Sequence, residues 1–187
     1  EYVFKNDRSL IDQREVHYDT LSWEVALRSV LREDPNVIVI GEMRDYETVA
    51  SAVTIAETGH LVFATLHTNS AAQTVDRVVD IFPGEQQRQI KVQLASILKG
   101  VLCQKLVPTI SGGSVPAVEV LLGTPPVQSV IRDGKTHLID NIINTSVELG
   151  MISFDRSLAD LVTRGKVSRD EALRFTEHPD EFARLLA

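Results

Sequence analysis

Cysteine is almost absent from the sequence, since Cys103 is the only one among 187 residues. One cysteine excludes an internal disulfide and a cysteine-rich zinc site, and this usage suits a reducing compartment, so the cytoplasm is the expected location. Basic residues are also few: 26 Asp and Glu stand against 19 Lys and Arg. A protein that binds nucleic acid through its phosphates needs the opposite balance, so we expect no nucleic-acid partner.

The sequence also lacks a long apolar run, an N-terminal Met and a signal peptide. No apolar stretch approaches the roughly 18 to 20 residues of a membrane-spanning helix, so we expect no direct membrane insertion. Residues 1–5 contain no Met and do not resemble a signal peptide; they have the character of sequence from the middle of a domain. We therefore expect the chain to be a fragment of a longer protein.

The residues that are present, 43% apolar and 24% charged, are ordinary for a folded domain. Val37–Ile40 and Leu61–Leu66 are apolar runs without polar alternation, which is typical of strands buried on both faces of a parallel sheet. The segment between them has helical spacing and ends at Gly59, so the pattern predicts a strand, helix, strand crossover. This is the signature of an α/β fold.

The rest of the chain divides into two patterns. Residues 102–122 carry two extended runs around Ser111–Ser114, which predicts a β-hairpin. From Thr124 onward the periodicity is helical only. We therefore predict an incomplete α/β core over residues 1–122 and a helical C-terminal subdomain over residues 123–187.

Polar side chains follow both predicted strands. Gly41 and Glu42 come directly after the first, and His67 follows the second. Carboxyl ends of parallel strands share one edge of a sheet, so Glu42 and His67 are expected on the same rim. An acid at a strand tip is the Walker B arrangement, in which a carboxylate holds Mg²⁺ or a water beside a nucleotide phosphate. The alternative, that Glu42 only begins a helix and His67 is a structural histidine, stays open on spacing alone.

Two other candidate sites are excluded by their context. His60 and His67 are seven positions apart with a strand between them, so they point to opposite sheet faces and cannot easily share a zinc ion. Residues 129–136 end in Gly-Lys-Thr, but Ser129 replaces the first glycine of a phosphate loop and the segment follows a Pro-Pro helix start, not a strand. We predict a turn between helices there.

Several stretches, in order along the chain, resemble the motifs of the type II/IV secretion ATPase superfamily, and most closely those of its twitching-motility pilus-retraction branch. They are Ile11–Val16, Ala26–Pro35, Val37–Asp45 and Glu57–Ala72. The similarity runs from Glu1 to about Lys135. It implies an incomplete RecA-like P-loop ATPase core with a mainly parallel sheet. It also implies a hexameric motor that hydrolyses ATP with Mg²⁺ to retract type IV pili, peripheral at the inner membrane, with an inner-membrane pilus platform protein as partner.

The resemblance also implies roles for single residues. Glu1 matches the last acid of the Asp box, the catalytic glutamate that orients the attacking water. Glu42 matches the Walker B acid that holds Mg²⁺, and His67 matches the second histidine of the His box, which contacts the terminal phosphate. Further matches are nucleotide-binding candidates: Gly41, Gly59, His60, Arg28, Arg32 and Arg77. For the three arginines, surface ion pairs with neighbours such as Glu24 and Asp76 are the alternative.

The chain departs from the family in places that limit these implications. The phosphate loop would precede Glu1, so this chain alone is expected to hydrolyse no ATP. The retraction signature Ala-Ile-Arg-Asn-Leu-Ile-Arg-Glu aligns with Pro126–Asp133, where Gln128 replaces the first arginine and Arg132 keeps the second. This leaves a retraction ATPase and its accessory paralogue both open.

The choice of the pilus-retraction branch also depends on a cysteine motif that this chain lacks. Extension and type II secretion ATPases usually carry two Cys-x-x-Cys pairs that bind zinc after the segment matching Gln104–Val107, whereas this chain continues into a short Gly-Gly turn. We therefore expect no zinc. The alternatives are a related type II secretion or pilus-assembly ATPase, or a non-catalytic assembly module that has lost the phosphate loop.

Overall fold

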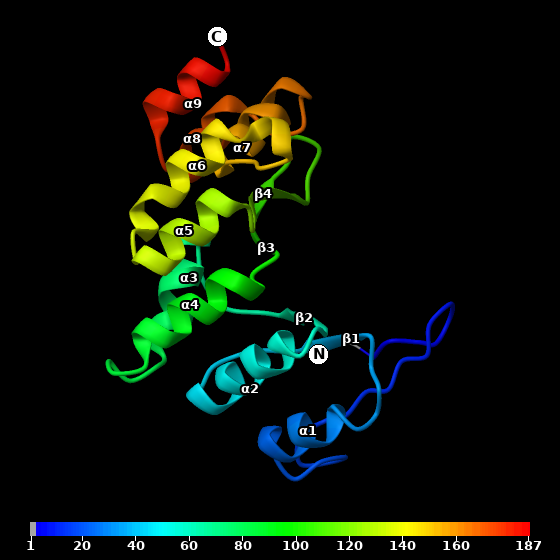
Figure 1. The fold of residues 1–187 in the computed structure, drawn as a ribbon. Coiled ribbons are helices and arrows are strands. Elements are labelled where there is room, and N and C mark those ends of the chain that lie inside the picture. Colours follow the sequence, from blue (N-terminus) through cyan, green and yellow to red (C-terminus); the bar gives the residue numbers. More distant parts are fainter. Residues whose placement is uncertain (1–2) are drawn as a thin grey trace. The chain divides into compact units, whose positions relative to one another are not determined.

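The computed structural model describes residues 3–187, and the chain divides into two compact units, Glu1–His67 and Thr68–Ala187 (Figure 1). The first unit contains α1 (Trp23–Val30), β1 (Val37–Ile40), α2 (Tyr46–Glu57) and β2 (Leu61–Ala64). The two strands pair in parallel, with Val37 opposite Leu61. The predicted crossover is therefore confirmed.

Local signals set the ends of α2. Asp45 is its N-cap, and the carboxylate accepts a hydrogen bond from Thr48 N at 2.8 Å. The helix ends at Glu57, and Gly59 follows with φ of 98°. A left-handed residue just past a helix end is a common stop signal, and glycine adopts it without a Cβ penalty.

One face of the two-stranded sheet is covered and the other is not. Ile38 and Ile40 are buried in a core that also contains Leu27 of α1 and Ile55 of α2. The alternate side chains point the other way, and they are exposed by 43 to 63%: Val37, Val39, Leu61 and Phe63. The prediction of burial on both faces is therefore wrong for this chain, because α1 and α2 cover one face and no other described part of the first unit covers the second.

The second unit begins with two helices and a hairpin. These are α3 (Ala71–Asp80), α4 (Gln87–Ile97), β3 (Gly100–Pro108) and β4 (Ser114–Leu122). The strands are antiparallel, with Pro108 opposite Ser114, so the predicted hairpin is confirmed. Gly112 and Gly113 lie in the turn with positive φ, which their missing side chains permit.

Helices follow the hairpin, as the periodicity predicts, and the exception is an isolated antiparallel bridge between Ile152 and Val120. They are α5 (Pro125–Asp133), η1 (Thr136–Leu138), α6 (Ile139–Thr145), η2 (Val147–Leu149), α7 (Phe154–Thr163), α8 (Arg169–Phe175) and α9 (Pro179–Leu185). Gly134 ends α5 in the left-handed conformation, so the Gly-Lys-Thr segment is the predicted turn between helices. The domain boundary at residue 122 is placed where the periodicity becomes helical, and it stays a prediction.

The core of the second unit joins the hairpin to the last helices. Val107 and Ala117 of the hairpin pack with Leu158 of α7, Ala172 of α8 and Phe182 of α9, and all five are almost completely buried. Apolar burial of this kind holds short helices in place, since seven-residue helices such as α8 and α9 are marginal on their own.

Gly123, which joins β4 to α5, lies against backbone. A Cβ added there would come within 2.0 Å of Leu98 O. We expect Gly123→Ala to lower the free energy of unfolding by roughly 1–3 kcal/mol, since the backbone would have to shift. Urea titration of the purified protein checks this, with Gly84→Ala as the matched control, because a Cβ at Gly84 meets nothing within 4 Å. Equal midpoints for the two variants would contradict the expectation.

Candidate functional site

Glu42 lies one residue beyond Gly41, at the carboxyl end of β1. Two hydrogen bonds hold this strand end beside the corresponding end of β2. Met43 N donates to Thr65 O at 3.0 Å, and the side-chain hydroxyl of Thr65 donates to Gly41 O. Asp45 caps α2 at the other end of the short loop. The loop from Gly41 to Asp45 is therefore fixed at both ends.

His67 reaches Glu42 from the second strand. His67 Nε2 lies 2.9 Å from Glu42 Oε1. The Glu42 side chain is 22% exposed and the His67 side chain 82% exposed, so the histidine ring faces solvent. The structure thus brings together the two residues that the parallel-strand argument placed on one rim.

Arg44 is a member of this group that the sequence reasoning missed. Its Nε pairs with the same carboxylate oxygen, Glu42 Oε1. The hydrogen bond from Arg44 lowers the pKa of the Glu42 carboxyl below its ordinary value, and the charges of Arg44 and His67 act in the same direction. The signal was available, since a basic residue two positions after an acid can fold back onto it when the loop turns.

Glu42 fits a magnesium site in which phosphate oxygens and waters supply most of the ligands. Among residues 3–187 no cluster of three or more His, Cys, Asp or Glu side chains could hold a metal. Mg²⁺ in nucleotide enzymes commonly uses one or two carboxylates together with phosphate oxygens and waters. Glu42, an ionised carboxylate at a strand tip, can supply one such ligand.

The other predicted site residues in the first unit lie elsewhere. Gly59 and His60 precede β2, at the opposite end of the strand from His67, and His60 Nδ1 lies 2.8 Å from Thr58 Oγ1. Arg28, on α1, pairs with Glu24, which is the surface ion pair of the alternative interpretation. Arg32 lies in the turn after α1. Glu1 lies outside the described residues.

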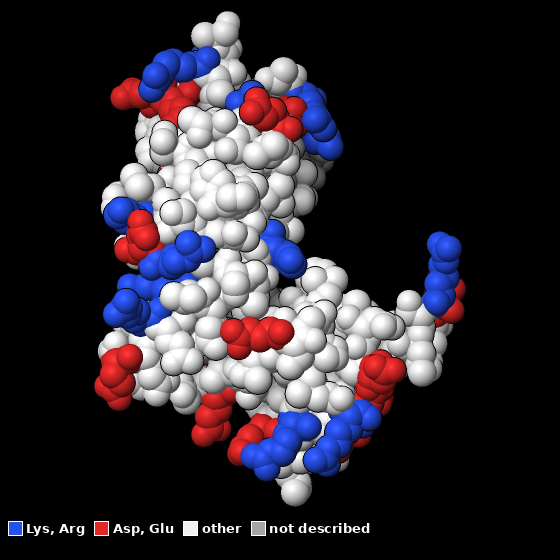
Figure 2. Space-filling model, viewed as in Figure 1, with Lys and Arg blue, Asp and Glu red and all other residues white. Residues whose placement is uncertain are grey.

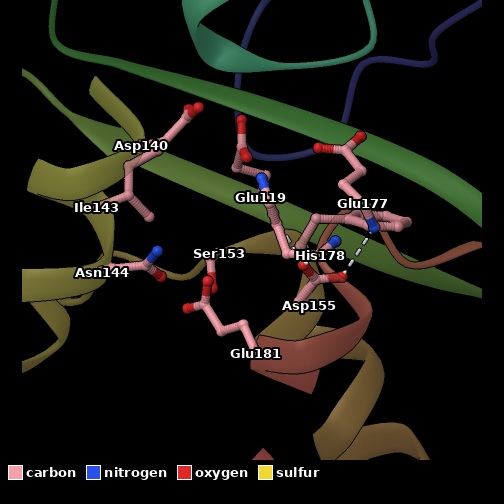
Figure 3. A pocket seen from close by; sticks show the side chains of 10 residues that line it. Glu119, Asp140, Ile143, Asn144, Ser153, Asp155, Glu177, His178 and Glu181 are labelled. Carbon is pink, nitrogen blue, oxygen red and sulfur yellow. Dashed lines mark hydrogen bonds and ion pairs between the residues drawn. The ribbon is translucent and has the colours of Figure 1, made fainter. Parts of the chain in front are cut away.

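In the second unit, Arg77 occupies the last turn of α3 and is exposed. This unit also contains an acidic pocket, lined by Glu119, Asp140, Asp155, Glu177 and Glu181 together with His178 (Figure 3). Periodicity gave no signal for it, because its members come from four segments of the chain.

Two carboxylates of the acidic pocket are buried. Asp155 accepts hydrogen bonds from Thr176 Oγ1, from the backbone N–H groups of Glu177 and His178, and from His178 Nδ1. It thereby holds the segment that leads into α9. Burial raises the pKa of the Glu119 carboxyl, while its hydrogen bond from Ala71 N acts in the opposite direction.

Charge is mixed over the visible surface. On the face shown in Figure 2, Lys and Arg side chains lie among Asp and Glu side chains. None of the helices within residues 3–187 has both the length and the apolar composition needed to cross a membrane.

Residues 9–152 match the family described as type II/IV secretion system protein. The chain belongs to this family. It is 47% identical over 182 residues, 97% of its length, to the type IV pilus retraction ATPase PilT of Pseudomonas aeruginosa, of which it covers 53%. It is 44% identical over 98% of its length to a twitching motility protein of Neisseria gonorrhoeae, of which it covers 49%. The chain thus spans about half the length of these relatives.

A solved structure supports the fold. The crystal structure of the pilus retraction motor PilT with bound ADP matches 98% of this chain and 52% of that chain, with a TM-score of 0.87 and 43% identity. The predicted superfamily and the predicted fold, an incomplete RecA-like ATPase core followed by helices, are therefore confirmed.

Proposed function

We propose that the chain is the C-terminal portion of a hexameric motor ATPase that couples ATP hydrolysis to type IV pilus retraction. The observation that carries this proposal is the pairing of Glu42 with His67 at 2.9 Å, at the carboxyl ends of two parallel strands. Similarity over nearly the whole chain to a retraction ATPase supports the choice of branch.

In this proposal the first unit supplies charged groups for the nucleotide. Glu42 would supply one carboxylate ligand to Mg²⁺, and the bound ion would neutralise charge that develops on the phosphates. His67, which is exposed beside Glu42, contacts the terminal phosphate. Glu1 orients the attacking water. Bound ADP in the related crystal structure supports nucleotide binding at such a core.

The remaining nucleotide-site candidates have weaker support. Gly41 directly precedes Glu42, and its carbonyl oxygen accepts a hydrogen bond from Thr65 Oγ1. Gly59, His60, Arg28, Arg32 and Arg77 stay proposals for contacts with nucleotide or across a subunit boundary. An arginine that stabilises transition-state charge from a neighbouring subunit can be worth about 10³-fold or more in rate.

The proposed partners are copies of the same protein and an inner-membrane pilus platform protein, at the cytoplasmic face of the membrane. Gene deletion tests the branch. Loss of a retraction motor should leave cells with surface pili that do not retract, whereas loss of an assembly or type II secretion ATPase should remove pili or block secretion. A non-catalytic module would instead show no ATP hydrolysis as a purified whole protein.

We also expect the protein to contain no stoichiometric zinc. Cys103 is buried and is the only cysteine, and the β3–β4 turn is too short to carry a Cys-x-x-Cys insert. Elemental analysis of the purified protein checks this, with a zinc-binding protein as positive control. About one zinc per chain would reopen the extension-ATPase alternative.

A further inference from the structure

Glu119 of β4 makes a buried contact with the start of α3. Glu119 is 6% exposed, and its Oε1 accepts a hydrogen bond from Ala71 N at 2.6 Å. Ala71 is the first residue of α3 and is completely buried. The two residues are 48 positions apart in the sequence, so this bond joins distant parts of the second unit.

The bond adds to a helix cap that is already present. Ser70 is the N-cap of α3, and its Oγ accepts from Gln73 N at 3.3 Å. The first N–H groups of a helix have no partner within the helix, so Ala71 N needs an acceptor from elsewhere, and Glu119 provides it. A carboxylate at a helix N-terminus also interacts favourably with the helix dipole.

The segment that directly follows His67 is tied to the same turn. Thr68 Oγ1 lies 2.7 Å from Thr74 Oγ1, and Thr74 Oγ1 also donates to Ser70 O at 2.9 Å. Asn69 N donates to Gln73 Oε1 at 3.3 Å. Residues 68–70 are therefore held to the first turn of α3, and Thr68 is the residue bonded covalently to His67.

We propose that Glu119 is a positioning residue that anchors the first turn of α3, and with it the segment carrying His67, to the β3–β4 hairpin. The inference rests on the proposed function, in which His67 contacts the terminal phosphate. Glu119 itself touches no nucleotide. Its loss should therefore lower turnover and leave nucleotide affinity almost unchanged.

Two variants of similar size separate the hydrogen bond from the buried volume. Glu119→Gln keeps an oxygen that can accept from Ala71 N, whereas Glu119→Met fills the same space without an acceptor. Asp140→Asn is the matched control, since Asp140 lines the same acidic pocket (Figure 3) but comes from α6. If Glu119→Met does not fold, as judged by circular dichroism, Glu119→Asp replaces it, since the shorter side chain cannot keep the 2.6 Å contact.

The test combines kinetics with hydrogen exchange on the whole protein. For Glu119→Met we expect kcat to fall about tenfold, nucleotide Kd to stay within about twofold, and amides of residues 71–74 to exchange about tenfold faster. Glu119→Gln and Asp140→Asn should resemble the wild type in all three. Wild-type exchange and turnover in Glu119→Met would overturn the proposal, and so would an equal loss in Glu119→Gln.

Failure of the proposed function gives a different result. If the wild-type whole protein hydrolysed no ATP, the ATPase proposal would be wrong while the exchange rates still decided whether Glu119 anchors α3. If the wild type hydrolysed ATP and Glu119→Met changed exchange but not kcat, the anchoring of His67 would be refuted and the ATPase proposal would stand.

Discussion

Glu42→Gln in the whole protein is expected to keep nucleotide binding and to lose ATP hydrolysis by about 10²-fold or more. The amide keeps the shape of the side chain but removes the charge that faces the metal. Fluorescent-nucleotide titration measures binding and a coupled phosphate-release assay measures turnover. Nucleotide binding should therefore stay near the wild-type value while turnover falls.

The control is Glu85→Gln, which neutralises an exposed glutamate in the turn between α3 and α4. It should behave as wild type in both assays. The alternative that Glu42 only begins a helix does not hold, because α2 begins at Tyr46 after the N-cap Asp45. A near-normal hydrolysis rate for Glu42→Gln would therefore leave Glu42 as a loop residue that only pairs with Arg44. Loss of binding together with turnover would instead indicate a damaged fold.

Arg132→Ala is the second change with a large expected effect. On α5, Val127 and Ile131 are buried, whereas Arg132 is exposed. An exposed arginine is available to a partner, and the family resemblance places it in a signature needed for retraction. We expect basal ATP hydrolysis to stay within about threefold, under ~0.7 kcal/mol in barrier, while twitching is abolished.

The matched control is Arg156→Ala, which removes an exposed arginine from α7. Twitching should persist in this variant. Normal twitching in Arg132→Ala would refute the coupling role and leave a solvated helix arginine. Collapsed hydrolysis would show that Arg132 serves the active site or the fold. Gln128, at the position of the first signature arginine, donates instead to Gly123 O at 3.3 Å, so it contributes to the local turn.

Much of the fold was predictable because it depends on local pattern. The β-branched run Val37–Ile40 and the Gly-Gly turn each specify an element within a few residues. The proximity of Glu42 and His67 followed from a general rule, that carboxyl ends of parallel strands share an edge.

Two features that escaped prediction depend on contacts between distant segments, and a third depends on how a short loop turns. The Glu119 bond to Ala71 spans 48 positions and leaves no periodic signal. The exposed side of the β1–β2 sheet, with Val39 and Phe63, depends on which elements pack there, and an apolar run cannot reveal that. The Arg44 pair depends on the turn of a loop, which periodicity does not describe.

The most direct test of the central claim is to observe individual labelled pili on cells in which this gene supplies the only retraction ATPase candidate. With the wild-type protein, we expect pili to shorten. With Glu42→Gln at equal protein abundance, pili should assemble and stay extended. Retraction that continued at the wild-type rate with Glu42→Gln, or pili that stayed extended with the wild-type protein, would contradict the account.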